Sequence, residues 1–414
     1  MSQSMQWVSA LSTEPSLEAA IAEVVNQAQA ALEVTPDLGL VFISSAFASE
    51  YPRIMPLLRK HLSIPHLIGC SGGGVVGMSE AGKVDEVEHQ PALSLSLAAL
   101  PDVEVQSFHI DANDLPDLDS SPNQWVELIG VSPEANPHFI LLSDPFTSNI
   151  NELLQGLDFA YPGSVKVGGL AGASSISNQS GLFCNYQSYD KGTVGIALSG
   201  NIVLEAIVAQ GCRPIGQPYR VVEGDRNILL KLAALNEDIS DTSRTPLELL
   251  QDIFKTLDAD DQRLLENSLF VGIAQSEFKQ VLEQGDFLIR TLIGVDPRNG
   301  AIAIGDRVRP GQRIQFHLRD ANASADDLET LLQRYQGETL SAPTSPVGAL
   351  MFACVGRGEG LYGQPNFDSR LFQQYFNVPL SGFFCGGEIG PVGRATFLHG
   401  YTSVFGICRQ LNEG

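Results

Sequence analysis

Apolar residues along this chain recur at two spacings, which predict helices and strands in alternation. Residues 16–32 place apolar side chains three and four positions apart behind a serine, the pattern of an amphipathic helix with an N-cap. The short apolar run at 38–44 predicts a strand, residues 48–62 predict a second helix, and residues 65–69 predict a strand that ends in glycines. After the helix at 16–32, the chain is therefore predicted to form a unit of strand, helix, strand and glycine turn.

The same unit recurs twice more along the chain. The stretch HLIGCSGGGVVG at 66–77 aligns with VPLSGFFCGGEIG at 378–390, because three further glycines coincide when Gly69 is set on Gly382. A weaker copy, VKVGGLAGASS at 165–175, keeps two glycines at the same spacing. Each stretch follows a strand of similar character, LVFISSAF, FILLSDPF or ALMFACVGRG.

This repeat predicts where loops gather. If the two strands of a unit are parallel, both end at one edge of the sheet, where ligand sites concentrate. Glycines at such an edge let a ligand or another chain segment approach the backbone. The segments expected to share an edge are 44–47 with 69–74, 144–146 with 168–172, and 354–357 with 382–388.

Two familiar motifs overlap in the first glycine stretch. Residues 69–73 fit the G-x-S-x-G nucleophile elbow, and residues 72–77 fit the G-x-G-x-x-G phosphate loop. Both motifs need a helix that begins on the glycines. The alternating run at 91–100 that follows predicts a strand instead. We therefore expect neither motif to function here, and we interpret Ser71 as part of a glycine turn.

The fold class predicted from these patterns is α/β with mixed sheets. Between the repeats, residues 181–212 contain strand-like runs separated by turn sequences, which predict antiparallel hairpins. We predict two domains, residues 1–216 and 217–414, each with mixed sheets and outer helices. An αββα sandwich is one arrangement that this pattern allows.

Composition excludes several classes of protein. A net charge of −23 and a pI near 4.6 argue against nucleic acid as a partner, because phosphate binding needs clustered lysine and arginine. The first residues lack the basic and apolar regions of a secretory leader, and no apolar run approaches the roughly 20 residues that span a bilayer. The six cysteines lack metal-ligand spacing. We expect a cytoplasmic protein with no membrane partner.

Arg357 and Glu388 are the strongest candidates for ligand recognition. A charged residue among glycines at a strand end has little local reason to be there, and one charge of each sign would suit the carboxylate and ammonium of an amino acid. The alternative is that the two side chains bridge each other. The other predicted ligand-binding residues lie at the same edges: Ser44, Gly72, Gly73, Asp144, Cys354, Gly386 and Gly387.

A catalytic or cofactor role rests on fewer observations. Arg357 could lower the pKa of the Cys354 thiol if the two approach, although free cysteine is usually a buried apolar residue. His66, His317 and His399 lie on or beside apolar strands, but no pair has metal-ligand spacing. We therefore expect no catalytic residue and no cofactor. Haem is the one cofactor that we keep as an alternative.

Several long motifs together resemble the FIST family. They are QGCRPIG at 210–216, FLIRTLIGVDPRNGAIAIGD at 287–306, MFACVGRGEGLYG at 351–363 and VPLSGFFCGGEIGP at 378–391. That family pairs FIST N and FIST C domains in bacterial signalling proteins and in some F-box proteins. The resemblance implies a sensory, small-ligand-binding module without an established reaction, with amino acids or related metabolites as ligands. Because the sequence shows no kinase or cyclase signature, we expect a separate signalling protein to supply the output. A protein-interaction scaffold, a haem-dependent sensor and a thiol- or serine-dependent enzyme are the alternatives.

Overall fold

A computed structural model describes residues 4–172, 180–235, 243–275, 279, 281–282, 285–340 and 342–411. The chain forms two compact units. The larger unit consists of Met1–Val208 and Leu331–Gly414, and the smaller unit, Ala209–Thr330, is inserted between these two parts of the chain. The domain boundary predicted between residues 216 and 217 falls inside a strand of the smaller unit, β14 (Cys212–Asp225). All three repeats belong to the larger unit.

The larger unit contains three copies of one succession of elements, which we call the first, second and third copies. The first copy comprises β1 (Gln6–Ser12), α1 (Leu17–Ala31), β2 (Leu38–Ser44), the 3-10 helix η1 (Ser45–Glu50), α2 (Tyr51–His61), β3 (His66–Gly72), β4 (Gly74–Met78), β5 (Val84–Glu88) and β6 (Leu93–Ala99). The second copy comprises β7 (Val103–Ile110), η2 (Ala112–Asp114), α3 (Pro122–Ile129), η3 (Pro133–Ala135), β8 (His138–Ser143), α4 (Ile150–Ala160), β9 (Lys166–Leu170), β10 (Leu182–Cys184), β11 (Gln187–Tyr189) and β12 (Thr193–Gly200). The third copy comprises β13 (Ile202–Ala209), α7 (Ala321–Thr339), β20 (Pro346–Cys354), α8 (Gly358–Tyr362), α9 (Phe367–Tyr375), β21 (Leu380–Cys385), β22 (Glu388–Val392), β23 (Ala395–His399) and β24 (Ser403–Gln410). The smaller unit interrupts the third copy after β13 and includes the first part of α7, so that only residues 331–339 of this helix belong to the larger unit.

Each copy builds most of one six-stranded mixed sheet, and the three sheets share one order. The orders are β1-β6-β2-β3-β10-β11, β7-β12-β8-β9-β22-β23 and β13-β24-β20-β21-β4-β5. In every sheet the two strands joined by a helix are parallel: β2 with β3, β8 with β9, and β20 with β21. This confirms the predicted strand-helix-strand unit. Residues 173–175 of the weaker repeat lie outside the described residues.

The copies exchange their hairpins in a closed cycle. The hairpin β4–β5 of the first copy pairs with β21 of the third copy, β22–β23 of the third pairs with β9 of the second, and β10–β11 of the second pairs with β3 of the first. Each sheet therefore contains strands from two copies. Because every copy completes another copy's sheet, no copy has a full set of paired strands by itself.

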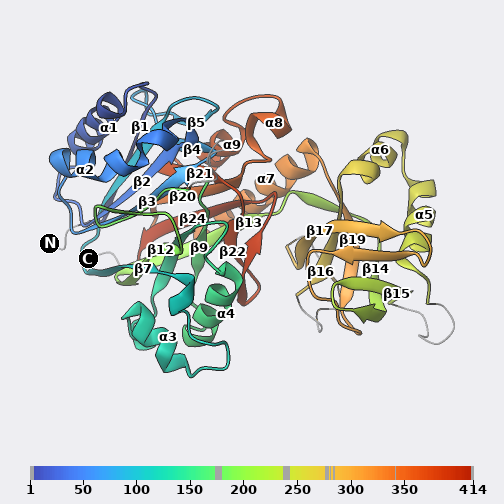
Figure 1. The fold of residues 1–414 in the computed structure, drawn as a ribbon. Helices are drawn as coiled ribbons and strands as arrows, with labels where there is room; N and C mark the ends of the chain where they lie inside the picture. Colours follow the sequence, from blue (N-terminus) through green and yellow to red (C-terminus); the bar gives the residue numbers. More distant parts are fainter. Residues whose placement is uncertain are drawn as a thin grey trace. The chain divides into compact units, whose positions relative to one another are not determined.

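The three sheets share one core, and helices cover their outer faces (Figure 1). Phe42, Leu142 and Phe352 hold equivalent positions in the first strands of the three units, and all three are buried in this core. On the outer face of the first sheet, α1 and α2 bury a second apolar cluster; α3 and α4 do the same in the second copy. This confirms the predicted arrangement of mixed sheets with outer helices.

The repeated glycines follow from the close approach of parallel strands. Gly69, Gly168 and Gly382 each lie opposite one residue of the neighbouring strand, Val41, Leu141 and Met351. A Cβ atom on Gly168 or Gly382 would lie 1.8 Å from the carbonyl oxygen of that residue, and one on Gly69 would lie 2.1 Å away. Only glycine fits at this position in all three copies.

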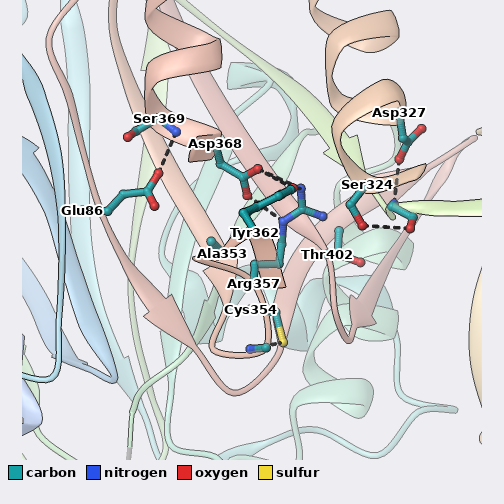
Figure 2. A network of polar contacts seen from close by, with 12 residues as sticks. Glu86, Ser324, Asp327, Ala353, Cys354, Arg357, Tyr362, Asp368, Ser369 and Thr402 are labelled. Atoms are coloured by element: carbon teal, nitrogen blue, oxygen red, sulfur yellow. Dashed lines mark hydrogen bonds and ion pairs between the residues drawn. The ribbon is translucent and has the colours of Figure 1, made fainter. Parts of the chain in front are cut away.

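The smaller unit is a closed six-stranded barrel. Its elements are β14 (Cys212–Asp225), β15 (Ile228–Ala234), α5 (Pro246–Thr256), α6 (Ala259–Asn267), β16 (Leu269–Ala274), β17 (Phe287–Asp296), β18 (Ala301–Ile304) and β19 (Arg313–Arg319), with barrel order β14-β15-β18-β17-β16-β19. At its start the N–H of Gly211 donates to Asp327 at 2.7 Å, and the carbonyl of Gly211 accepts from Ser324 at 3.1 Å (Figure 2). In the described residues no helix is long and apolar enough to cross a membrane.

Candidate functional site

The glycine turns of the three copies are joined by a ring of backbone hydrogen bonds. Gly73, Gly172 and Gly386 occupy equivalent positions, four residues after the glycine that faces the neighbouring strand. The N–H of Gly73 donates to Phe384 at 2.8 Å, that of Gly172 to Ser71 at 2.7 Å, and that of Gly386 to Leu170 at 3.3 Å. The acceptors are equivalent too, so the carboxyl ends of all three parallel pairs meet at one place, which we call the glycine ring.

Ser44, Asp144 and Cys354 occupy equivalent positions in the three copies. Ser44 ends β2 and Cys354 ends β20, whereas Asp144 directly follows β8. The Ser44 hydroxyl accepts the Ala92 N–H at 3.1 Å. The Asp144 carboxylate accepts the N–H groups of residues 146 and 147 and the hydroxyl of Ser180. The Cys354 sulfur accepts the N–H of residue 356 at 3.4 Å. All three side chains are buried. Asp144 and Cys354 stabilise the turn that follows them, whereas Ser44 binds the segment that leads into β6.

The predicted glycines differ in what surrounds them. A Cβ atom on Gly72 would lie 2.5 Å from a backbone carbonyl oxygen, one on Gly73 would lie 2.7 Å from Val355, and one on Gly387 would lie 3.0 Å from Leu170. Packing therefore requires glycine at Gly72 and leaves little room at the other two. Gly386 is exposed and would place a Cβ atom in open space. Gly386 is thus the glycine of this set that leaves room for another molecule.

Arg357 is fully buried and forms an ion pair with Asp368 of α9. Its Nε and Nη2 atoms lie 2.6 and 2.9 Å from the two carboxylate oxygens of Asp368, a bidentate arrangement. The Tyr362 hydroxyl accepts from Arg357 at 2.6 Å and donates to Asp368 at 2.8 Å (Figure 2). The sequence suggested Glu388 as a bridging partner of Arg357, whereas the ion pair in the structure is formed with Asp368.

Glu388 begins β22 and is also fully buried. It accepts the Thr402 N–H at 3.0 Å, and the Cys385 thiol lies 3.5 Å from its other oxygen. Burial raises the pKa of Glu388 to about 8, although hydrogen bonds from Thr402, Cys385 and Cys354 and the charge of Arg357 act in the opposite direction. Burial therefore favours the protonated form of Glu388, whereas its hydrogen bonds and the charge of Arg357 favour the carboxylate form.

These ionisable residues break the symmetry of the glycine ring. The positions equivalent to Arg357 hold Phe47 in the first copy and Thr147 in the second, and the position equivalent to Glu388 in the first copy holds Val75. The fold is thus built in the first copy with apolar side chains at both positions. Because burying ionisable groups opposes folding, their presence in the third copy favours a functional role there.

A second buried carboxyl group, Glu86, lies beside the Arg357–Asp368 pair. It belongs to the exchanged strand β5 and accepts the backbone N–H of Ser369 at 2.7 Å (Figure 2). Burial raises its pKa to about 7, and the negative charges of Asp368 and Glu88 act in the same direction. Three buried carboxyl groups, Glu86, Asp368 and Glu388, therefore accompany one buried guanidinium.

Protonation of Glu86 and Glu388 predicts a pH-dependent stability. Both folded pKa values lie above the usual 4.5, so between pH 4.5 and about 7 or 8 the folded state binds more protons than the unfolded state. Stability from each group is present at low pH and is lost as pH rises, by up to about 1.4 kcal/mol per pH unit. We expect Glu86→Gln to flatten the dependence between pH 5 and pH 8, measured by urea unfolding.

The control for this measurement is Glu127→Gln at an exposed position of α3. Relative to the wild type, Glu86→Gln should gain stability as pH rises, whereas Glu127→Gln should follow the wild-type curve. Parallel curves for wild type and Glu86→Gln would show that Glu86 ionises normally in the folded protein.

The remaining candidate side chains have hydrogen-bond partners within the protein. The Ser71 hydroxyl donates to the Gly172 carbonyl at 2.7 Å and accepts the Gly181 N–H at 2.9 Å. His66 contacts Ser107, His399 contacts a backbone carbonyl, and burial lowers the pKa of His317 to about 4. In the described part of the chain no group of three or more His, Cys, Asp or Glu side chains is placed to hold a metal ion.

Asp368, Tyr362 and Glu86 were missed by sequence reasoning. Asp368 lies in the first turn of α9, where an acidic residue is the usual complement to the helix dipole and gives no sign of burial. Glu86 lies in the run VDEVE, which has the composition of a solvent-facing strand. Tyr362 could have been found from the sequence, because it lies in the stretch MFACVGRGEGLYG at 351–363, one of those that carry the family resemblance.

This arrangement defines a protein with a threefold-repeated α/β unit and an inserted barrel. Residues 37–234 match the FIST N domain and residues 246–391 match the FIST C domain. An uncharacterized protein of Mycobacterium tuberculosis is 33% identical over 395 residues, which are 95% of this chain and 97% of the relative. A second uncharacterized protein of that species is 30% identical over 393 residues, 94% of this chain and 95% of the relative. F-box only protein 22 of Homo sapiens is 38% identical over 85 residues, 19% of this chain and 21% of the relative. The chain belongs to the FIST family, whose domains form a sensory module.

Proposed function

We propose that this protein is a sensor that binds a small polar metabolite, an amino acid or a related amine. The ligand binds at the glycine ring, on the turn that the third copy contributes. The ligand lies over Gly386, whose turn faces open space, and its amino group is recognised by Glu388. The observation that carries this proposal is the buried Glu388 carboxyl group, which has an apolar equivalent in the first copy and lies two residues from Gly386.

The contacts of Glu388 suggest how a cation would reach it. Cys354, which is 7% exposed, and Cys385 both hydrogen-bond to Glu388. Both thiols are weak hydrogen-bond donors, so an ammonium group that displaces the Cys354 thiol gains a stronger, charge-assisted bond. An ammonium beside Glu388 also stabilises its carboxylate form.

Arg357 acts in this proposal as a positioning residue. Its two bonds to Asp368 tie the turn after β20 to α9, and its positive charge lowers the pKa of Glu388. We propose binding without turnover, since both hydrogen-bonding roles of the Ser71 hydroxyl are used by backbone groups. The output is carried by a separate signalling protein.

A thermal-shift screen tests this proposal. The purified protein is heated with each of the twenty amino acids, with nucleotides and with haem, beside the variants Glu388→Gln and Gly386→Leu. Ligand at about 100 times its Kd stabilises the native state by about 2.7 kcal/mol, which corresponds to a rise of several degrees in Tm. We expect an amino acid to raise the Tm of the wild type and to lose this effect in both variants.

Gly386→Leu also serves as a folding control, because its side chain points into open space and should leave the Tm without ligand unchanged. A wild-type protein that melts cooperatively and responds to no amino acid would contradict the proposal. A response to haem alone would assign a haem-dependent sensor instead, and a shift that persists in both variants would place the ligand elsewhere.

A further inference from the structure

The barrel unit carries an apolar groove that the ligand-binding proposal does not use. The groove has a volume of about 530 Å³ and lies between α5, α6 and the end of β17. Its apolar lining includes Leu250 and Phe254 of α5, Leu265 of α6, Leu269, and Leu292 and Val295 of β17. Gln251, Lys255 and Glu266 are the polar lining residues.

Several apolar side chains in the walls of this groove are exposed to solvent. Phe254 is 36% exposed and Val295 is 43% exposed. Leu264 and Leu265, the two leucines of α6, are only half-buried, whereas α5 buries four residues against the barrel. A concave apolar surface of this kind, with polar residues at its border, is typical of a protein-binding site.

The charge around the groove selects a basic occupant. Residues 244–267, which contain α5 and α6, have six acidic side chains and three basic ones. Arg244 and Lys255 both pair with Asp252, Arg263 pairs with Asp260, and Arg213 of β14 pairs with Asp261. The remaining negative charge attracts a basic segment, and it disfavours a second copy of this chain, whose net charge is −23.

The lining of the groove favours a helical occupant. Leu247, Leu250 and Phe254 of α5 recur at spacings of three and four residues, so α5 presents a row of apolar side chains to the groove. A helix matches such a row, because its own apolar side chains recur at the same spacings. We propose that this groove docks an amphipathic helix with a basic outer face, supplied by a partner protein.

A synthetic peptide tests the proposal directly. The probe is a fluorescein-labelled helix of about five turns, built from leucine on one face and lysine on the other, titrated with the full chain while fluorescence anisotropy is recorded. We expect saturable binding that Phe254→Asp weakens at least about tenfold, the loss typical of a central aromatic contact. Val295→Asp, on the opposite wall of the groove, should give a similar loss.

The control is Leu118→Asp in the larger unit, where the leucine is 50% exposed. All three variants add one negative charge, so general attraction to an acidic protein would tighten binding in each of them equally. Docking in the groove requires weaker binding for Phe254→Asp and Val295→Asp and unchanged binding for Leu118→Asp. Circular dichroism confirms that the groove variants fold.

Three results would overturn the inference. The first is wild-type affinity in Phe254→Asp, the second is equal affinity for a peptide with glutamate in place of lysine, and the third is a wild-type dimer in sedimentation that Phe254→Asp dissociates. The third would assign the groove to a second copy. The inference stands apart from the ligand site, because Phe254→Asp should leave the thermal shift given by an amino acid unchanged.

Discussion

Gly382→Ala is expected to prevent stable folding of the larger unit. The new Cβ atom would lie 1.8 Å from the carbonyl oxygen of Met351 and 2.7 Å from its carbonyl carbon, and both are backbone atoms that cannot rotate away. The parallel strands β20 and β21 would have to separate where the third sheet is built. A loss of more than about 4 kcal/mol in the free energy of unfolding follows, which belongs to the most damaging class of single substitutions.

Gly168→Ala should behave in the same way, since its Cβ atom would lie 1.8 Å from the carbonyl oxygen of Leu141. Gly386→Ala is the matched control, because this glycine has no atom within 4 Å of the added carbon. Urea unfolding or thermal melting of the three variants compares them. A Gly382→Ala protein that melts with the wild type would show that these glycines are not held against the neighbouring strand.

Breaking the buried ion pair is the second large effect that we expect. Asp368→Leu leaves the Arg357 guanidinium buried without its bidentate partner, and Arg357→Met leaves the Asp368 carboxylate without its cation. Each single change should lower the free energy of unfolding by about 3–5 kcal/mol. The double variant should be more stable than either single variant, because it removes both charges and replaces them with apolar side chains of similar size.

Arg263→Met is the control for the ion pair. Its partner is Asp260 on the same helix, and both side chains are largely exposed, so its loss should change stability by less than about 0.5 kcal/mol. Four chemical unfolding curves, with the double variant included, give the coupling energy of Arg357 and Asp368. An Asp368→Leu variant as stable as Arg263→Met would mean that water reaches the pair in solution.

The sequence was enough to predict the repeated unit but not the way in which the copies combine. Gly69 and Gly382 each mark a parallel strand pair in the sequence, because each glycine faces the neighbouring strand of its own copy. The exchange of β4–β5 onto the third sheet joins residues about 300 positions apart, and an alternating pattern shows that a strand has a buried face without showing which sheet buries it. The insertion of the barrel could not be predicted, because the amino-acid composition does not change at residues 209 and 330, where the smaller unit begins and ends.

The same limit applies to the candidate site. Ser44, Asp144 and Cys354 were placed correctly at strand ends, since local sequence determines where a strand ends. The partner of Arg357 could not be predicted, because α9 brings Asp368 beside it through packing of a helix on the sheet. Sequence also cannot show that Gly386 faces open space while Gly72 faces a carbonyl group, since both are glycines in the same kind of turn.

Proton release on binding is the measurement that tests the ligand site most directly. The amino acid that gives the largest thermal shift is titrated calorimetrically at pH 7 in buffers of different ionisation enthalpy. Because the pKa of Glu388 is raised to about 8, recognition of an ammonium group by its carboxylate predicts release of about one proton per ligand. The Glu388→Gln variant, which should not bind the ligand, should give no binding heat in any of these buffers. Binding to the wild type without proton release, or equal release by the variant, would contradict the central claim that Glu388 recognises the ligand.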